Sequence, residues 1–236
     1  MKAVILAGGK GTRLVPYTTV FPKPLMPIDG MPILEVVVRQ LAHFGIKELI
    51  FTVSRQSEPL LSAYFGNGRQ FGVKVEYSRE EEPLGTAGPL SRLHDLPPSF
   101  LVMNGDILTT LDYGALIRYH KQRKPMVTIA VSRKKVPIDF GVLEFDRVRR
   151  LTHYREKPVL SCSVSMGVYV FDRKVLNWIP RGCYFDFPDL IQKLLKEGQR
   201  VLCYPNQDFW LDIGRHEDYE EAQKRFQKMR KKLLRE

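Results

Sequence analysis

Apolar runs alternate with amphipathic stretches through the first half of the chain. Four short apolar runs predict buried strands; they are residues 3–7, 49–53, 73–77 and 100–104. Four stretches with helical spacing follow them in turn, at residues 33–45, 58–65, 84–93 and 113–121. This alternation is typical of βαβ units. It predicts an α/β fold of the Rossmann-like, doubly wound kind, with helical layers on both faces of a mostly parallel mixed sheet.

The pattern changes beyond Pro125. Extended pieces are expected at residues 127–133, 141–145, 148–154 and 165–171, as hairpins that build the second wall of a pocket. A helix at 189–197, a short strand at 201–204 and a helix at 217–235 complete the chain. We expect a catalytic domain over residues 1–222 and a basic helical tail over residues 223–236.

Composition narrows the class of protein. The 236 residues are 44% hydrophobic, enough for one sizeable core. Cys162, Cys183 and Cys203 show no C-x-x-C spacing, so we expect neither a disulfide framework nor a zinc cluster, and a reducing cytoplasm fits three free thiols. No stretch approaches the roughly 20 apolar residues of a membrane span, so an integral membrane protein is not expected.

The net charge of +11 points to an anionic partner: a nucleic acid, a lipid or a phosphorylated metabolite. Part of the excess lies in the tail, at Lys224, Arg225, Lys228, Arg230, Lys231, Lys232 and Arg235. Such a tail is usually a solvated helix face. Docking to another subunit and a basic helix on a membrane surface are the alternatives. No nucleic-acid-binding motif or aromatic platform is present, so we expect no nucleic-acid partner.

A glycine-rich turn follows the first predicted strand. Gly8, Gly9 and Gly11 would let backbone N–H groups approach phosphate oxygens, and Arg13 adds a guanidinium. A tight turn that needs glycine only for its dihedral angles is the simpler interpretation. The Walker A pattern is absent, and Leu14 occupies the place of the third Rossmann glycine.

A lysine lies between two prolines shortly after that turn. Pro22 and Pro24 restrict the backbone around Lys23, which would aim its ammonium group. A surface lysine in a proline-rich loop is the alternative. Close to the glycine turn, the segment predicts a phosphate clamp with Arg13 and Lys23 as its charged groups.

Together these motifs resemble the sugar-phosphate nucleotidyltransferases, also called nucleotide-sugar pyrophosphorylases. The resemblance rests on Leu6-Ala7-Gly8-Gly9-Lys10-Gly11-Thr12-Arg13-Leu14 and Pro22-Lys23-Pro24, and it covers roughly residues 1–222. It continues in Glu82-Pro83-Leu84-Gly85-Thr86-Ala87-Gly88, Asn104-Gly105-Asp106, Phe140-Gly141-Val142, Glu156-Lys157-Pro158 and Trp210-Leu211-Asp212-Ile213-Gly214. No C-terminal β-helix is expected.

The resemblance implies a role for each motif. Its catalytic residues would be Arg13, Lys23, Asp106, Lys157 and Asp212, with Mg²⁺ shared by Asp106 and Asp212. The nucleotide would bind Leu6, Ala7, Gly8, Gly9, Gly11, Thr12, Glu82, Gly85, Thr86 and Asn104. The sugar phosphate would bind Gly141, Glu156, Lys157 and Ser165. From the residues alone, Asn104-Gly105-Asp106 is equally a β-turn and Thr86 a helix cap.

One position departs from the family pattern. Ser165-Met166-Gly167 stands where the family usually has Asn-Ala-Gly, so a hydroxyl replaces a sugar-contacting amide. This changes the expected sugar contacts and not the reaction.

The resemblance implies transfer of a nucleoside monophosphate from an NTP to a sugar 1-phosphate, with release of pyrophosphate. The Glu82–Gly88 loop is closest in appearance to mannose-1-phosphate guanylyltransferases and their heptose relatives, which favours GTP with a mannose-like hexose or heptose 1-phosphate. Uridylyl or thymidylyl transfer to glucose 1-phosphate is the alternative. An NADP-dependent oxidoreductase and a non-catalytic regulatory homologue are the alternatives outside this reaction, and a homo-oligomer is compatible with all of them.

Overall fold

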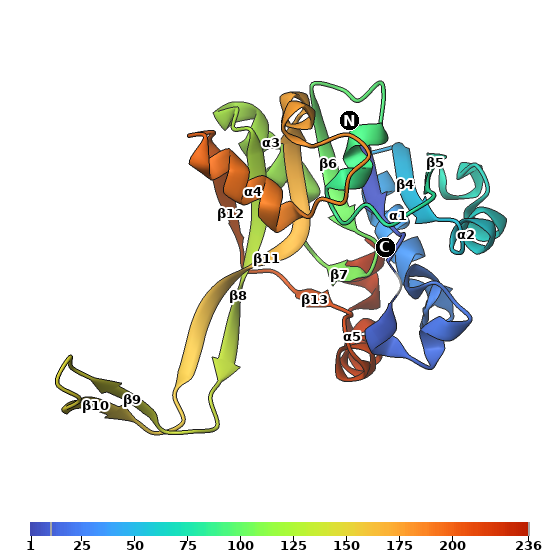
Figure 1. The fold of residues 1–236 in the computed structure, drawn as a ribbon. Coiled ribbons are helices and arrows are strands. Elements are labelled where there is room, and N and C mark those ends of the chain that lie inside the picture. Colours follow the sequence, from blue (N-terminus) through green and yellow to red (C-terminus); the bar gives the residue numbers. More distant parts are fainter. Residues whose placement is uncertain (10, 236) are drawn as a thin grey trace.

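The computed structural model describes residues 1–9 and 11–235 and is built on a seven-stranded sheet (Figure 1). The strand order is β12-β8-β11-β6-β1-β4-β5. The strands are β1 (Lys2–Leu6), β4 (Glu48–Ser54), β5 (Lys74–Glu80), β6 (Ser99–Asn104), β8 (Val127–Pro137), β11 (Val159–Asp172) and β12 (Val201–Asn206). Only β11 runs antiparallel to its neighbours in this sheet. The predicted mostly parallel mixed sheet is confirmed.

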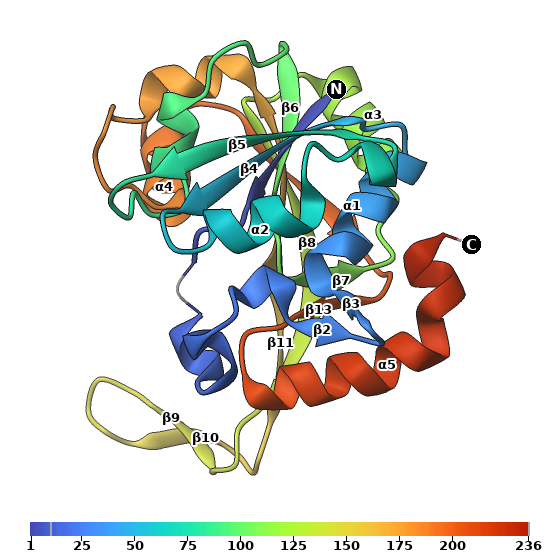
Figure 2. The same ribbon diagram turned by 90° about the vertical axis from the view of Figure 1, so that its right-hand side faces the viewer.

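Helices cover both faces of the sheet (Figures 1 and 2). They are α1 (Ile33–His43), α2 (Glu58–Phe65), α3 (Tyr113–Arg123), α4 (Phe187–Lys196) and α5 (His216–Leu234). Alternation along β1 shows the layering: Ala3 and Ile5 pack in one buried cluster with Leu34 of α1, whereas Val4 packs in another with Leu190 of α4. The predicted three-layer arrangement is therefore confirmed.

Two long strands leave the sheet and form an arm, residues 133–163. The outer halves of β8 and β11 pair with each other and carry the hairpin of β9 (Val142–Phe145) and β10 (Leu151–Arg155), which projects from the body (Figure 1). The sequence predicted strands only at 127–133 and 165–171. It missed the outer halves because their side chains are mostly exposed, so they show no alternation of buried and exposed positions.

The helix expected at residues 84–93 is wrong. A short 3₁₀ helix, η5 (Gly88–Arg92), is present instead. The preceding residues extend along another segment: the N–H groups of Ala87 and Gly88 both donate to the carbonyl oxygen of Phe185. Those bonds and the positive φ of Gly85 take the backbone out of helical geometry.

The C-terminal helix α5 is one continuous element across residue 222. Its inward face packs Ala222, Phe226 and Leu233 against Leu14 and Ile28. Near its end, the buried side-chain amide of Gln40 donates to the carbonyl oxygen of Leu233 at 2.7 Å. Residues on both sides of the expected boundary therefore share one core. No helix in the described part of the chain is long and apolar enough to cross a membrane.

Truncation of Phe226 tests how firmly α5 belongs to the core. Because Phe226 is fully buried, Phe226→Ala is expected to lower the free energy of unfolding by about 3–5 kcal/mol. The exposed neighbour Gln227 is the matched control, and Gln227→Ala should change it by less than about 0.5 kcal/mol. Chemical denaturation measures both, and equal small effects would show that the helix contributes little to stability.

Candidate active site

The carboxyl ends of β1 and β6 lie side by side. Leu6 pairs with Asn104 in register, and the N–H of Gly105 donates to the carbonyl oxygen of Leu6 at 3.0 Å. The glycine turn and the Asn104-Gly105-Asp106 segment therefore leave the sheet at the same edge. Ligands of open α/β sheets bind at this edge.

The glycine turn passes into two short 3₁₀ helices, η1 (Thr12–Leu14) and η2 (Tyr17–Thr19). Gly11 adopts a left-handed φ of 61°, and its carbonyl oxygen accepts bonds from the N–H of Leu14 and the hydroxyl of Thr18. A Cβ at Gly9 would meet only open space. Lys10 and the side chain of Thr12 lie outside what the structure describes.

Lys23 lies at the start of the 3₁₀ helix η3 (Lys23–Leu25) and forms an ion pair with Asp106. Its Nζ contacts Oδ2 of Asp106, with side chains that are only 12% and 19% exposed. Pro22 is extended, at φ −55° and ψ 136°, and Pro24 is buried. The two prolines fix the backbone on both sides of the lysine. The ammonium group of Lys23 therefore points toward Asp106.

A small antiparallel pair brings the two candidate metal ligands together. Strand β7 (Ile107–Thr109) pairs with β13 (Trp210–Asp212), placing Asp212 opposite Ile107, and the N–H of Ile213 donates to the carbonyl oxygen of Asp106 at 3.2 Å. Burial, together with the charge of Asp106, raises the pKa of Asp212 despite the opposing charges of Lys23 and Arg13.

Arg13 lies beside the same pair. A Cβ placed at Gly214 would be 3.7 Å from Nη1 of Arg13 and 3.7 Å from Oδ2 of Asp212. The structure thus gathers two cations and two carboxylates, from four separate segments of the chain, at the edge where β1 and β6 end.

These carboxylates fit a divalent cation. Oδ1 of Asp106 is buried with no hydrogen-bond partner in the described residues, although such an atom is costly to leave unpaired. No group of three or more His, Cys, Asp or Glu side chains in that part of the chain could hold a metal alone. Mg²⁺ commonly binds through one or two carboxylates and takes its other ligands from water and substrate phosphates. The pair therefore suits Mg²⁺ held jointly with a phosphorylated substrate.

The Glu82–Gly88 loop is fastened to the start of α4. Asp186 Oδ1 accepts bonds from the N–H and the hydroxyl of Thr86, and that hydroxyl accepts a bond from the N–H of Phe187. A Cβ at Gly85 would lie 2.7 Å from the carbonyl oxygen of Phe185, so only glycine fits there. Thr86 thus caps α4, and not the helix that the sequence suggested for residues 84–93.

A different acid reaches the glycine turn. Glu82 is exposed, whereas Glu80, the last residue of β5, is buried. Oε2 of Glu80 accepts a bond from the N–H of Leu84, and Oε1 would lie 3.2 Å from a Cβ at Gly8. Burial raises the pKa of Glu80. Glu80 therefore lies between the glycine turn and the Glu82–Gly88 loop.

Ser165 lies at an irregularity in β11. Its Oγ accepts a bond from the N–H of Gly167 and is 2.9 Å from the hydroxyl of Tyr169. A Cβ at Gly167 would lie 2.7 Å from Nδ2 of Asn104, so this segment packs against the end of β6. The hydroxyl of Ser165 is therefore engaged within the chain.

The remaining sugar-side residues lie on the arm. A Cβ at Gly141 would lie 2.6 Å from the hydroxyl of Tyr154, which donates to Glu156. Lys157 is exposed, in a left-handed turn with φ 42°. No ion pair or hydrogen bond within the described residues joins Glu156 or Lys157 to Asp106 or Asp212. The structure brings together the metal and triphosphate candidates, and leaves these two apart from them.

Comparison with known sequences identifies the family. The family described as "Nucleotidyl transferase" matches residues 2–229. The chain belongs to this family. Relatives of the chain include a UTP–glucose-1-phosphate uridylyltransferase from Synechocystis, 35% identical over 94% of this chain. A mannose-1-phosphate guanylyltransferase from Mycobacterium tuberculosis is 33% identical over 92%. The chain spans 62% of the length of either relative.

Solved structures with a similar fold agree with this family assignment. A putative glucose-1-phosphate thymidylyltransferase from Bacillus anthracis aligns with a TM-score of 0.79 and 25% identity over 95% of this chain and 94% of that one. HddC from Yersinia pseudotuberculosis aligns with a TM-score of 0.75 and 27% identity over 95% of this chain and 99% of that one. HddC has also been solved in complex with GMP-PN. The predicted nucleotidyltransferase fold is confirmed, and the oxidoreductase alternative has no support.

Two acids near the candidate site, Glu80 and Asp186, were not predicted from the sequence. Glu80 was overlooked because Glu80, Glu81 and Glu82 are adjacent and only their burial distinguishes them. Asp186 was overlooked because its partner Thr86 is 100 residues away in the sequence. The sequence carries no signal for Glu80: the alternation of the strand predicted at 73–77 would place it on the exposed side with Lys74 and Glu76, and its burial breaks that alternation.

A substitution at Thr86 separates a structural role from a nucleotide-binding role. Thr86→Val removes both side-chain hydrogen bonds and is expected to lower the free energy of unfolding by about 1–3 kcal/mol. Thr86→Ser keeps the hydroxyl and is the matched control, expected close to the wild type. Denaturant titration measures stability. If Thr86→Val were as stable as the wild type but bound the NTP poorly, the hydroxyl would serve the nucleotide instead.

Proposed function

We propose that this nucleotidyl transferase transfers a nucleoside monophosphate from an NTP to a sugar 1-phosphate and releases pyrophosphate. The observation that carries the proposal is the group of Arg13, Lys23, Asp106 and Asp212 beside the glycine turn. Paired cations next to two carboxylates suit a polyphosphate bound with a metal ion. A cytoplasmic location and a homo-oligomer stay predictions.

The reaction needs positioning more than proton transfer. A phosphate oxygen of the sugar 1-phosphate attacks the α-phosphorus in line, one new P–O bond forms, and the bond to the leaving pyrophosphate breaks. The attacking phosphate is already ionised near neutral pH, so no general base is needed. Lys23 and Arg13 neutralise phosphate oxygens, and pyrophosphate leaves toward Gly11, Thr12 and Arg13. Asp106 and Asp212 would hold Mg²⁺, which supplies positive charge to the phosphates when bound.

The sugar 1-phosphate is assigned to the arm side of the site. Glu156 would accept hydrogen bonds from sugar hydroxyl groups and Lys157 would hold the phosphate, with Gly141 and Ser165 beside them. Since these residues lie apart from Asp106, this assignment requires the arm to approach the β7–β13 pair when the sugar phosphate is bound. The engaged hydroxyl of Ser165 would contribute less to sugar recognition than the amide usual in the family.

GTP is the proposed nucleotide, with Leu6, Ala7, Gly8, Gly9, Gly85, Thr86 and Asn104 around it and Glu82 at the rim. Glu80 supports this choice. Guanine presents two neighbouring donors, N1–H and N2–H₂, and a carboxylate accepts both. A mannose-like hexose or heptose 1-phosphate is the proposed acceptor, with a uridylyl or thymidylyl transfer to glucose 1-phosphate as the alternative. The relatives include uridylyl- and guanylyltransferases, so the substrate pair needs a direct test.

Pyrophosphate release tests the proposal. The chain is assayed with Mg²⁺ across GTP, UTP, dTTP, CTP and ATP, each combined with mannose, glucose, galactose, fucose and heptose 1-phosphates. Release with GTP and a mannose-like acceptor above all other pairs is the expected result. Release with another pair would confirm the reaction and overturn the substrate choice. No release from folded protein that binds a nucleotide sugar would favour the regulatory homologue.

A further inference from the structure

The positive charge of the chain is concentrated in two segments. The arm, residues 133–163, carries eight Lys or Arg against four Asp or Glu, and residues 224–235 carry seven against none. These segments account for the whole net charge of +11, so the rest of the chain is neutral. A charge so localised is typical of a surface that meets an anionic partner.

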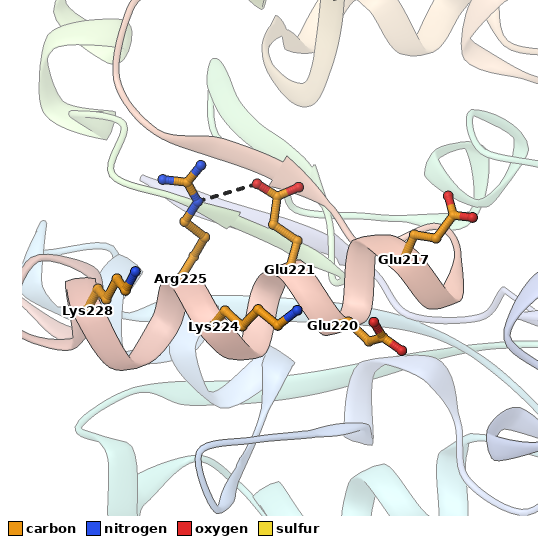
Figure 3. Close-up of a pocket in the computed structure, with 6 residues that line it drawn as sticks. All are labelled: Glu217, Glu220, Glu221, Lys224, Arg225 and Lys228. Carbon is orange, nitrogen blue, oxygen red and sulfur yellow. Dashed lines mark hydrogen bonds and ion pairs between the residues drawn. The ribbon is translucent and has the colours of Figure 1, made fainter.

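The basic residues of α5 form a stripe that faces away from the body. At 100° per residue, Lys224, Lys228 and Lys231 lie opposite the buried Phe226 and Leu233. Lys224 and Lys228 are exposed. Figure 3 shows them after the acidic residues of the first turns, with the ammonium group of Lys224 directed toward Glu220. Lysines in the last turn of a helix stabilise it by interacting with the helix dipole. Lys224 and Lys228 lie too far from the end of α5 to have this role.

The arm ends in a hairpin with one apolar face and one charged face. Phe145 pairs with Leu151 and Leu143 with Tyr154, and all four side chains are more than half exposed. The other face carries Glu144, which forms an ion pair with Arg155 and lies 3.7 Å from Nδ1 of His153. A two-stranded hairpin with an uncovered apolar face is marginally stable by itself. An exposed apolar face on such a hairpin is typical of a surface that contacts a partner.

The turn between β9 and β10 carries three arginines. The carboxylate of Asp146 accepts bonds from the N–H groups of Val148 and Arg150, which fixes the turn. Val148 is 79% exposed, and Arg147, Arg149 and Arg150 are exposed around it. The tip of the hairpin therefore exposes both apolar and cationic side chains.

The hairpin and the basic helix lie at the same end of the molecule. In both views, β9–β10 and most of α5 lie below α3 and α4; in Figure 2, α5 begins on the side of the hairpin and its last turns rise away from it (Figures 1 and 2). One extended partner can therefore contact the apolar tip and the lysine stripe together.

We propose that this end of the protein docks on an anionic lipid bilayer. Anionic headgroups attract the lysine stripe and the tip arginines, and the boundary with the acyl chains accepts Phe145, Val148 and Leu151. A second copy would bring two basic surfaces together, which opposes that pairing. A nucleic acid would satisfy the cations and leave the apolar side chains in water. The bilayer matches both features, and this inference does not depend on the proposed reaction.

Vesicle flotation of the full chain tests the proposal. The protein is expected to float with vesicles of phosphatidylcholine that contain phosphatidylglycerol, to stay behind with phosphatidylcholine alone, and to be released by high salt. A Phe145→Trp variant reports insertion: its emission should shift to the blue only with the anionic vesicles, a shift that the wild type lacks.

Two sets of variants locate the contact. Lys224→Gln, Lys228→Gln and Lys231→Gln together should weaken vesicle binding roughly a hundredfold, at about fivefold per charge. Phe145→Ser with Val148→Ser should weaken it by roughly tenfold per side chain. The matched control combines Lys121→Gln on α3, Lys174→Gln on the 3₁₀ helix η6 (Arg173–Trp178) and Lys196→Gln on α4, and it should bind as the wild type does.

Several outcomes would overturn the proposal. These are no flotation with anionic vesicles, or equal losses in the lysine-stripe and control variants. A dimer in light scattering that Phe145→Ser with Val148→Ser dissociates would assign the apolar face to a second copy. Salt-sensitive retention on RNA that exceeds vesicle binding would assign the basic stripe to a nucleic acid.

Discussion

Replacing Asp106 by asparagine is expected to lower the turnover of nucleotide-sugar synthesis by roughly 10²–10³-fold. The substitution removes one of two carboxylates available to Mg²⁺ and the ion-pair partner of Lys23. The fold should persist, because the side chain keeps its size and the repulsion between Asp106 and Asp212 is relieved. Pyrophosphate release at saturating substrates measures the loss, and thermal unfolding of the same samples measures stability.

The chain offers a matched control for that substitution. Asp112, at the start of α3, is exposed, and its carboxylate accepts a bond from the N–H of Ala115. Asparagine is an equally good cap, so Asp112→Asn makes the same change of charge and should leave turnover within a few-fold of the wild type. Lys23→Ala removes the cation that pairs with Asp106 and is expected to lower turnover by the same order of magnitude. If Asp106→Asn or Lys23→Ala turned over like the control, the proposed roles would be wrong.

The meeting of the glycine turn and Asp106, the candidate triphosphate and metal side of the site, could be predicted from the sequence because both follow strand ends. Asp106 comes just after a buried apolar run, and the glycine turn comes just after another. Parallel strands bring such positions to one edge whatever the detailed packing. The position of Asp212 could not be predicted from strand order in this way, because β13 is short and only its pairing with β7 places that carboxylate beside Asp106. Its assignment came from the resemblance to the family.

The arm could not be predicted in the same way. Exposed charged residues along the outer halves of β8 and β11 give no buried face, so nothing local fixes where Glu156 and Lys157 lie. The motif Glu156-Lys157-Pro158 was recognisable, while its separation from Asp106 depends on how far two paired strands extend beyond the sheet. Hydrogen bonds between residues far apart in the sequence, such as those between Thr86 and Asp186, could not be predicted either.

Glu80 leads to the second large effect, which concerns the choice of base. Glu80→Gln is expected to lower kcat/KM for GTP by roughly ten- to a hundredfold, and to raise the ratio of UTP to GTP use. The amide keeps one acceptor for the N–H of Leu84 and replaces the other with a donor, which opposes the N–H groups of guanine. The loop should therefore stay in place while recognition changes.

The control for this variant is the acid two residues away. Glu82 is exposed, so Glu82→Gln should leave the ratio of UTP to GTP use unchanged. Measured kcat/KM values for both nucleotides, with one sugar 1-phosphate held constant, give the comparison. An unchanged ratio in Glu80→Gln would remove Glu80 from base recognition, and a change of ratio in Glu82→Gln would transfer that role to Glu82.

The pH dependence of the two enzymes provides an independent check on Glu80. Because burial raises the pKa of Glu80 above its ordinary value of 4.5, its carboxyl group gains a proton at a pH where an exposed glutamate is still ionised. A protonated carboxyl loses one acceptor, so the proposed preference of the wild type for GTP should decline as the pH falls through that raised pKa. Glu80→Gln has no such proton to gain, and its ratio of UTP to GTP use should stay level over the same range. A decline shared by both enzymes would mean that another group titrates, and Glu80 would then have no part in selecting guanine.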